Sequence, residues 1–392
     1  MDKYIPLSVP NFEGNERKYV DDAIDKVWVS TGGAYIAEFE KKIADYIGVD
    51  NVAACQSGTS AIHLSLVEAG IGFGDFVIVP ALTFIAAVNP VAYQGATPIF
   101  MDCDDSLCLD PIKLNDFCEN ECEYDGGRLK YNGSHIKAII VVHVFGNMAD
   151  MESIMNIAKK YNLIVIEDAT EALGTHYTEG DLNGKYAGTI GHFGCFSFNG
   201  NKIITTGGGG AVTSTESSVV DHIRFISTQA KTDPHFYSHD EIGYNYRMTN
   251  VQAAIGVAQM EEISEFIRRK NVNFDIYYDE FTGYKYCNLL PFRIGIYSNK
   301  WFYSLVINRD YIITSMKEIV NNLKNLGVET RPIWGLISEQ KPYMKCHKYK
   351  IEKAHYYADR VLNIPCSTNI KKEDINYVSS SIKSYLESIA IN

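Results

Sequence analysis

The chain lacks any long apolar segment, since none approaches the roughly 18 consecutive apolar residues expected of a membrane-spanning helix. It also lacks a basic stripe, and its net charge of −12 argues against a protein that binds nucleic acid. Its first residues, Met1 to Tyr4, do not have the pattern of a signal peptide. No internal repeat or low-complexity linker is visible. We therefore expect a cytoplasmic protein with no membrane or nucleic-acid partner, and the composition agrees with an enzyme.

Paired cysteines are missing too. The nine cysteines are scattered and none forms a Cys-x-x-Cys pair, which favours reduced thiols over a disulfide framework. The densest group has a spacing that departs from the usual zinc-binding patterns, and it consists of Cys103, Cys108, Cys118 and Cys122. We therefore expect no metal site.

Short apolar segments alternate with helical patterns between about residues 48 and 225. Strands are expected at residues 77–79, 97–101, 138–143, 163–167 and 195–198. This alternation predicts an α/β domain with a large, mainly parallel sheet.

A second domain is expected after this one. Asn250 has the position of a cap for a long helix that leads into it, and further on residues 301–307 have the pattern of a strand and residues 315–326 that of a helix. The length of 392 residues allows two domains. We place the large domain at residues 1–255 and a smaller α+β domain at residues 256–392.

Lys202 is the residue that we expect to define the chemistry. It follows Phe196, Ser197 and Phe198, whose alternation suits a strand with two differently buried faces, and it precedes the glycine run 207–210. Glycines let the backbone pack closely, and apolar walls disfavour an ammonium, so the amine becomes available as a nucleophile. Such an amine suits a Schiff base with pyridoxal phosphate (PLP). An isolated lysine is most often solvated, so this hypothesis depends on residues upstream.

A site for the cofactor's phosphate is predicted at Ser57-Gly58-Thr59-Ser60, directly before an apolar periodic run that is typical of a helix. Free N–H groups, the positive end of the helix dipole and the hydroxyls of Thr59 and Ser60 would converge on an anion. Gly58 would let the backbone approach it closely. These residues support the alternative, an ordinary helix cap, about equally well.

Two further residues fit the ring of such a cofactor. Asp168 ends the apolar run 163–166 after one intervening residue, and an acid at the carboxyl end of a buried parallel strand points into the crevice where open α/β sheets bind ligands. It could hold a pyridine nitrogen protonated, or it could cap the segment that follows. Phe84 follows the short strand 77–79 and could stack on the ring, although buried aromatic residues more often belong to the core.

In order and spacing, these residues resemble the DegT/StrS family of sugar aminotransferases, which have the aspartate-aminotransferase type of fold (PLP fold type I). The matching segments extend over nearly the whole chain: Gly32-Gly33, Phe39-Glu40, Ser57-Gly58-Thr59, Pro80-Ala81-Leu82-Thr83-Phe84, His143-Val144-Phe145-Gly146, Ile166-Glu167-Asp168-Ala169, Phe196-Ser197-Phe198 with Lys202, and Gly243-Tyr244-Asn245-Tyr246-Arg247-Met248.

The resemblance implies a role for each position. Lys202 would bind PLP as a Schiff base, and its freed amine would move the substrate's proton, so that the cofactor leaves the first half-reaction as pyridoxamine phosphate. Asn245 would reach the phosphate in the neighbouring subunit, which implies a homodimer with shared active sites. The remaining contacts to the cofactor would come from Asp168 at the ring nitrogen, Phe84 on the ring face, and Gly58, Thr59 and Ser197 at the phosphate.

Two positions depart from the family pattern. Glu171 stands where the family usually has a glutamine near the cofactor's phenolic oxygen. A second carboxylate so close could raise the pKa of an acid in the site or repel the phenolate. Gly208 stands where many members have a glutamate. Together with residues 199–202, both variants resemble the subgroup that makes 4-amino sugars for legionaminic acid or bacillosamine.

The resemblance then implies the reaction and its substrates. L-Glutamate would supply the amino group, and C4 of a nucleotide-linked, UDP-bound 4-keto-6-deoxy-N-acetylhexosamine would accept it. The alternatives are a GDP-4-keto-6-deoxymannose 4-aminotransferase and a regulator of the same fold that binds a sugar nucleotide without turnover. We assign Arg331 to an anionic substrate group, with Arg247 and Tyr244 as further candidates, and a structural ion pair is about as well supported for each arginine. Residues 228–246 form either a mobile loop near the substrate or a dimer contact.

Overall fold

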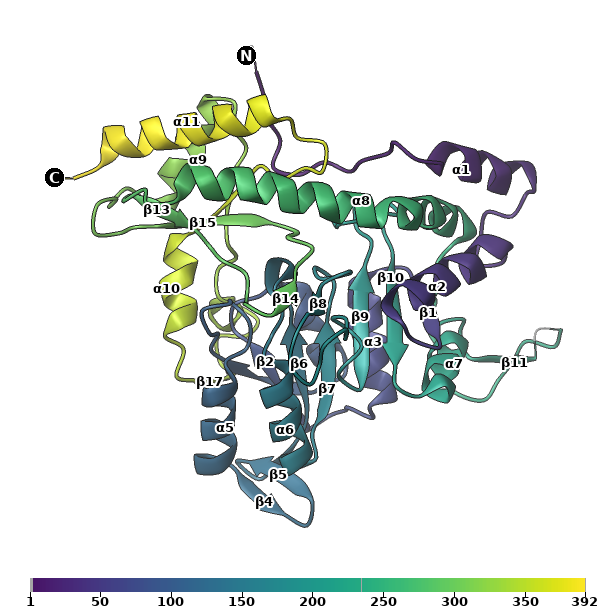
Figure 1. The fold of residues 1–392 in the computed structure, drawn as a ribbon. Helices are drawn as coiled ribbons and strands as arrows, with labels where there is room; N and C mark the ends of the chain where they lie inside the picture. Colours follow the sequence, from purple (N-terminus) through teal and green to yellow (C-terminus); the bar gives the residue numbers. More distant parts are fainter. Residues whose placement is uncertain (1–2, 234, 392) are drawn as a thin grey trace.

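The computed structural model describes residues 3–233 and 235–391. A large mixed sheet with helices on both faces forms most of the molecule, and the long helix α8 (Asn250–Phe281) runs along one side of it to a smaller domain that contains the C-terminus (Figure 1). The predicted boundary between residues 255 and 256 lies inside α8, so the two parts of the chain share one continuous helix.

The large sheet has the strand order β1-β10-β9-β7-β6-β2-β3-β17, with the hairpin β4–β5 attached to β6. Its strands are β1 (Val52–Cys55), β2 (Phe76–Pro80), β3 (Thr97–Met101), β4 (Glu123–Asp125), β5 (Arg128–Tyr131), β6 (Ser134–Val142), β7 (Ile164–Asp168), β9 (Phe193–Ser197), β10 (Gly210–Ser214) and β17 (His347–Tyr349). The run from β9 through β7, β6, β2 and β3 to β17 is parallel. Strand β10 is antiparallel to both of its neighbours, β9 and β1, so β1 has the same direction as the parallel run.

The mainly parallel α/β architecture predicted from the sequence is confirmed. All five predicted strands are present, as β2, β3, β6, β7 and β9, because their apolar runs are buried on both faces as a covered parallel sheet requires. The edge strand β17 was not predicted. It belongs to the C-terminal part of the chain, which therefore extends back onto the large sheet through the pairing of His347 with Ile99.

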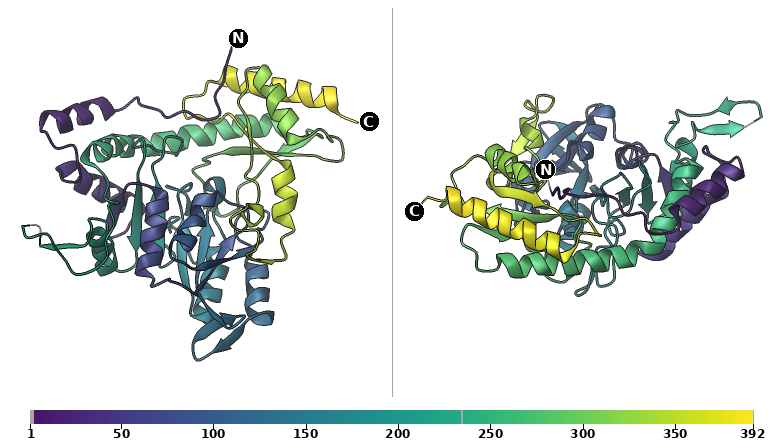
Figure 2. Two further views of the ribbon diagram at one scale, coloured as in Figure 1. Left: turned by 180° about the vertical axis from the view of Figure 1, so that it is seen from behind. Right: turned by 90° about the horizontal axis from the view of Figure 1, so that it is seen from above.

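Helices cover both faces of this sheet, with α5 and α6 on one face and α3 on the other (Figures 1 and 2). The elements of this part of the chain outside the sheet are α1 (Glu16–Asp25), α2 (Ala34–Ile47), α3 (Gly58–Glu68), α4 (Asn89–Tyr93), α5 (Pro111–Asn120), α6 (Met151–Tyr161), α7 (Ser217–Ile226), the 3₁₀ turns η1 (Ile85–Ala87) and η2 (Val144–Gly146), and the short strand β8 (His176–Tyr177). Within the described residues, no helix has the length and apolar character needed to cross a bilayer.

Helix α8 begins one residue earlier than its predicted cap, Asn250, implied. Thr249 is the N-cap, because its backbone is extended and its hydroxyl accepts a hydrogen bond from Gln252 N. The Gln252 side chain in turn accepts one from Thr249 N, which completes a capping box. Asn250 instead joins α8 to the N-terminal region: its amide donates to Trp28 O at 2.7 Å and accepts from Tyr35 N at 3.0 Å.

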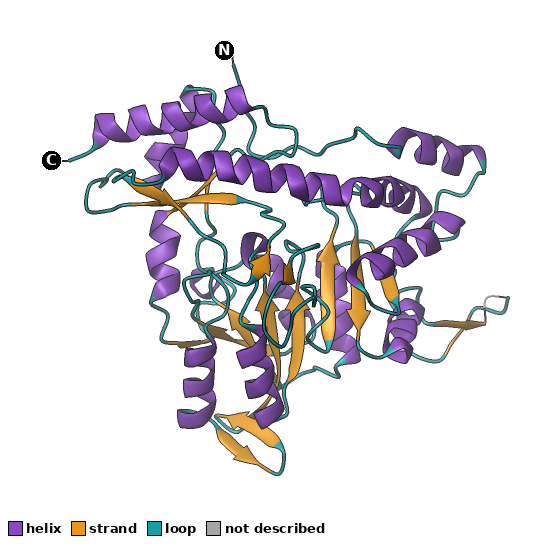
Figure 3. Ribbon diagram, in the orientation of Figure 1, coloured by secondary structure: helices purple, strands orange, loops and turns teal. Residues whose placement is uncertain are grey.

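The smaller domain is a four-stranded antiparallel sheet with helices against it (Figure 3). Its strand order is β13 (Cys287–Leu289), β15 (Tyr303–Ile307), β18 (Val361–Ile364) and β16 (Arg331–Pro332). The other elements are β14 (Ile296–Tyr297), which pairs with β8, and α9 (Met316–Asn325), η3 (Ile337–Glu339), α10 (Lys353–Arg360) and α11 (Lys372–Ile389). The predicted strand and helix appear as β15 and α9.

The segment at residues 228–246 contains a hairpin, β11 (Lys231–Asp233) and β12 (Ser238–His239), which stands out from the body of the molecule in every view (Figure 2). Residue 234, which follows β11 in the sequence, lies outside the described residues. Phe236 and Tyr237 are exposed at its tip. Exposed aromatic side chains on a projecting hairpin are typical of a contact surface.

Candidate active site

A cavity of about 440 Å³ lies at the carboxyl ends of β2, β7 and β9. Residues of the small domain form its opposite wall. The large domain contributes the start of α3, the segment after β2, the end of β7 and the loop after β9. The small domain contributes Trp301, Phe302, Arg331, Trp334 and Asn363. The crevice beyond the carboxyl ends of parallel strands is where open α/β sheets bind ligands.

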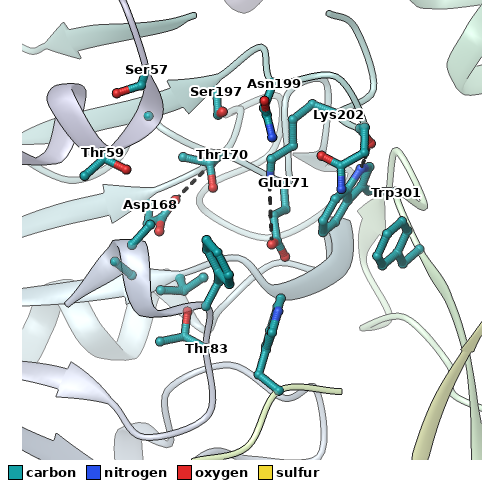
Figure 4. Close-up of a pocket in the computed structure, with 18 of the residues that line it drawn as sticks. Ser57, Thr59, Thr83, Asp168, Thr170, Glu171, Ser197, Asn199, Lys202 and Trp301 are labelled. Atoms are coloured by element: carbon teal, nitrogen blue, oxygen red, sulfur yellow. Dashed lines mark hydrogen bonds and ion pairs between the residues drawn. The ribbon is translucent and has the colours of Figure 1, made fainter. Parts of the chain in front are cut away.

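Lys202 extends from the loop after β9 into this cavity (Figure 4). Its side chain is only 12% exposed, and its Nζ lies 3.6 Å from Glu171 Oε1 and 4.1 Å from the centroid of the Trp301 ring. The Trp301 indole N–H donates a hydrogen bond to Asn201 O at 2.6 Å, which fixes the ring beside the loop that carries the lysine. The amine is therefore held between one carboxylate and one aromatic face.

Asp168 is the last residue of β7, and its side chain points into the cavity (Figure 4). The residue is 4% exposed, and Thr170 N donates to its Oδ1 at 3.1 Å. Burial raises the pKa of this carboxyl, since its negative charge is desolvated and the hydrogen bond and the Lys202 charge only partly offset that cost. A cationic ring nitrogen in the cavity would be a favourable partner for it.

The start of α3 forms the wall next to Asp168. Ser57 caps the helix, because its Oγ accepts a hydrogen bond from Ser60 N at 3.0 Å. The helix cap that was the alternative for this motif is therefore present. Thr59 and Ser197 line the cavity beside it. Gly58 cannot be replaced by a larger residue without movement, because an added Cβ would come within 2.8 Å of Thr170 Cγ2 and 2.9 Å of Ser197 Cβ. Ser57, Gly58 and Thr59 all line the cavity, so the positive end of the helix dipole faces it and can bind an anion.

Glu171 faces Lys202 from the segment after β7. Phe145 N donates a hydrogen bond to Glu171 Oε2 at 2.8 Å, and the other carboxylate oxygen points toward the lysine. Burial raises the pKa of Glu171 to about 7, and the neighbouring Asp168 charge adds to this while Lys202 opposes it. Around neutral pH, Glu171 can therefore either accept or donate a hydrogen bond in the cavity.

The remaining candidate residues divide into two groups. Phe84 and Arg331 line the cavity: Phe84 is 55% exposed with its ring centroid 6.5 Å from that of Trp334, and Arg331 Nη2 donates to Glu329 Oε1 at 3.1 Å. Arg247, Tyr244 and Asn245 do not line it.

Each residue of the second group has another place in the structure. The Arg247 guanidinium is bound by Glu40 and by Ala54 O, which is the structural ion pair considered as its alternative. Tyr244 stacks on Tyr246 with ring centroids 5.2 Å apart. Asn245 forms a backbone bridge with Thr228, at the base of the projecting hairpin. Within one chain, Arg247, Tyr244 and Asn245 therefore do not line the cavity.

Comparisons with known proteins identify the family of the chain. Residues 10–383 match the model of the DegT/DnrJ/EryC1/StrS aminotransferase family. The chain belongs to this family. It is 36% identical over 384 residues to a GDP-perosamine synthase of Escherichia coli O157:H7, covering 98% of this chain and 99% of the relative. It is 35% identical over 385 residues to a GDP-perosamine synthase of Caulobacter vibrioides, covering 97% of this chain and 98% of the relative.

A more distant relative acts on another class of nucleotide. It is a UDP-4-amino-4,6-dideoxy-N-acetyl-beta-L-altrosamine transaminase of Campylobacter jejuni, 29% identical over 364 residues, with 92% of each chain covered. Among solved structures, PseC of Helicobacter pylori has a TM-score of 0.88 at 22% identity, covering 98% of this chain and all of that one, which establishes the fold. As a member of the DegT/DnrJ/EryC1/StrS family, the chain is a PLP-dependent nucleotide-sugar aminotransferase.

Two residues that support the site have no local sequence pattern. The sequence predicts Trp301 only as part of a strand, and it gives Asn299, which lies beside the cavity-lining Trp301, no role. The Asn299 amide donates to Glu171 O and to Leu173 O, both at 3.0 Å, and its Oδ1 accepts from Trp301 N at 3.0 Å. This fully buried amide therefore fixes the small-domain segment that carries Trp301 to the large-domain segment that carries Glu171.

Glu171→Gln is expected to change how stability depends on pH. The folded pKa of Glu171, about 7, lies above its ordinary value of 4.5, so the folded protein binds the extra proton between these values and loses stability as the pH rises through that window. Glutamine has the same shape and does not ionise. We therefore expect the variant's advantage in free energy of unfolding to grow by about 2–3 kcal/mol between about pH 5 and about pH 8.

Urea unfolding of the cofactor-free wild type and variant at the two pH values measures this difference. Glu179→Gln is the matched control, because Glu179 is an exposed glutamate eight residues further along the chain, and its effect should be the same at both pH values. An advantage of Glu171→Gln that stays constant with pH would contradict the raised pKa.

Proposed function

We propose that this chain binds PLP at Lys202 and transfers the amino group of L-glutamate to C4 of a GDP-linked 4-keto-6-deoxymannose. The observation that carries the proposal is the buried Lys202 amine in one cavity with Asp168, Glu171 and the start of α3. PLP, when bound, supplies an electron sink that stabilises negative charge next to the reacting carbon. The residues of the chain position the reactants and move the protons.

The cavity fits this cofactor at three places. The start of α3 with Thr59 and Ser197 would bind the phosphate, and Gly58 lets this start pack closely against Ser197 and Thr170. Asp168, desolvated and hydrogen-bonded by Thr170 N, would hold a protonated ring nitrogen. Lys202 would bind the aldehyde carbon covalently and then, as a free amine, carry the proton between the substrate carbon and the cofactor.

Aromatic side chains would exclude water from the reacting groups. Phe84 and Trp334 are in contact across the mouth of the cavity, and Trp301 lies against the lysine. Arg331 lies among them on β16 and can bind a carboxylate or phosphate. The walls combine apolar surface with a few polar groups, as ligand cavities generally do.

The GDP-linked substrate is proposed because of the relatives. The similarity to GDP-perosamine synthases is 35–36% over at least 97% of the chain, against 29% over 92% for the UDP-linked sugar transaminase. This order favours the alternative stated from the sequence over the UDP-N-acetyl sugar. The regulator hypothesis has no support from the site, since a binding protein would not need a buried lysine beside two carboxyls.

We also propose that the active protein is a homodimer with shared sites. Asn245 does not line the cavity of its own chain, and the hairpin next to it presents Phe236 and Tyr237 to solvent. A second copy that covers this hairpin would bring Asn245 toward the neighbouring phosphate site, as the family resemblance implies.

The substrate proposal predicts a difference between two keto sugars. The protein is loaded with PLP, converted with glutamate, freed of excess donor and then mixed with either GDP-4-keto-6-deoxymannose or UDP-4-keto-6-deoxy-N-acetylhexosamine. We expect the GDP-linked sugar to restore the original visible absorbance at least about 100-fold more efficiently, because a site that hydrogen-bonds one substrate discriminates strongly against another. Mass spectrometry of the sugar product identifies the new amine.

Each other outcome has a definite meaning. Faster recovery with the UDP-linked sugar would replace the GDP proposal by the UDP one. Conversion by glutamate without recovery on either sugar would exclude both keto sugars as substrates. No change in absorbance on adding glutamate would contradict the aminotransferase reaction itself.

A further inference from the structure

Asn363 on β18 has an unusual combination of burial and missing contacts. The residue is 3% exposed, and its side chain lines the same cavity as Lys202. Its Oδ1 accepts a hydrogen bond from Ser304 Oγ at 2.6 Å. Within residues 3–233 and 235–391, its Nδ2 donates no hydrogen bond to a protein acceptor. Because the residue lines the cavity, these N–H donors are available to a ligand there.

The sheet register sets the direction of this amide. Asn363 is paired with Ser304 on β15 and with Arg331 on β16, so the three side chains lie side by side on one face of three adjacent strands. Because Ser304 Oγ holds the amide oxygen of Asn363, the two N–H donors of this amide are left for a group in the cavity or beside Arg331. Directly opposite residues on paired strands have Cβ atoms roughly 5 Å apart, close enough to bind one group together.

Arg331 alone is a weakened anion site. Its guanidinium shares a hydrogen bond with Glu329, whose other oxygen accepts from Leu7 N and from the Tyr4 hydroxyl. Its side chain is also 66% exposed, where water screens its charge. Asn363 adds neutral donors in the buried part of the same wall, where hydrogen bonds to a charged group are stronger than in water.

We propose that Asn363 and Arg331 form one receptor for an oxyanion of the substrate, with Ser304 as the residue that orients Asn363. This inference rests on the proposed function for its two sources of oxyanion, the carboxylate of the amino donor and the phosphate of the sugar nucleotide. Asn363 is then a specificity-determining residue of the site. It acts on binding and takes no part in moving protons.

Isothermal titration calorimetry of the PLP-loaded protein with two separate probes tests the receptor. Glutarate has the two carboxylates of the donor but no amine, and GDP has the phosphates but no sugar. Asn363→Leu removes the donors at similar volume and should weaken binding of one probe by about 10-fold or more, because a hydrogen bond to a charged group is lost. A loss with glutarate assigns the receptor to the carboxylate, and a loss with GDP assigns it to the phosphate.

Two further variants keep the result interpretable. Asn363→Asp keeps the shape of the amide and places negative charge next to the oxyanion, so the affected probe should bind at least as weakly as to Asn363→Leu. Asn288→Leu, on an exposed position of β13, is the matched control and should leave both affinities unchanged. Unchanged binding of both probes to folded Asn363→Leu and Asn363→Asp proteins, or no binding to the wild type, would overturn the receptor.

The outcome is separable from that of the proposed function. The two probes do not undergo amino transfer, so their binding does not depend on turnover. A protein that binds glutarate through Asn363 but fails to convert with glutamate would contradict the aminotransferase proposal and leave the receptor in place. Normal turnover together with unchanged probe binding in the Asn363 variants would contradict the receptor and leave the aminotransferase proposal in place.

Discussion

Lys202→Ala is expected to lower the rate of amino transfer by at least about 10³-fold, because one residue supplies both the covalent attachment and the proton carrier. In the structure, no second amine shares its position: among the described residues that line the cavity, Lys202 is the only lysine. Methylamine added to the variant cannot be held between Glu171 and Trp301 as the lysine is. Rescue should therefore remain far below the wild-type rate.

Two measurements check this result. The first is formation of 2-oxoglutarate from glutamate, which reports the amino transfer directly. The second is the mass of the protein after loading with PLP and reduction with borohydride. The wild type should gain one cofactor on the peptide that contains Lys202, and the variant should gain none there. Lys185→Ala, at an exposed turn, is the control and should keep both properties. An active Lys202→Ala protein would remove the basis of the proposed mechanism.

The large-domain half of the site could be predicted because it consists of short local patterns. Asp168 follows an apolar strand, Lys202 follows another, and Ser57-Gly58-Thr59 precedes a helix. Each pattern fixes which end of its element the side chain occupies. Parallel strands then bring these ends to one edge of the sheet, so neighbours in the cavity follow from the fold class.

The small-domain half could not be predicted in this way. Trp301 and Asn363 are separated from Lys202 by about 100 and 160 residues, and only the packing of the small domain on the large one brings them to the cavity. Asn363 in particular depends on the register of β18 with two other strands, and a shift by one residue would turn it to the other face.

Arg247 shows a choice that the sequence left open. Its chemistry suits an anion site and it lies within a family segment, but Glu40 binds its guanidinium, as the alternative of a structural ion pair stated. Both side chains are only about 10% exposed, so this ion pair is largely buried. An ion pair between residues about 200 positions apart has no local signature.

Asp168→Asn is expected to lower amino transfer by about 10²–10³-fold or more while increasing the stability of the cofactor-free protein. Asparagine keeps the shape of the side chain and can still accept the hydrogen bond from Thr170 N. It cannot carry the negative charge that would hold a ring nitrogen protonated. The electron sink that the cofactor supplies would be weaker, so every turnover should be slower.

The gain in stability has a separate cause. Burial raises the pKa of Asp168, which means that the folded protein resists ionisation of this carboxyl more than the unfolded chain does. Above the ordinary carboxyl pKa, the wild type therefore loses stability as the pH rises, and the variant does not. Urea unfolding of both cofactor-free proteins should show an advantage for Asp168→Asn at neutral pH that shrinks as the pH falls.

The two readouts together distinguish function from structure. Asp181→Asn, in an exposed surface turn, is the matched control and should change neither the rate nor the stability. If Asp168 served only to cap the segment that begins at Thr170, its replacement by asparagine, which caps equally well, would leave both properties unchanged. A slow but more stable variant instead means that the buried charge is retained for the reaction, at a cost to the stability of the fold.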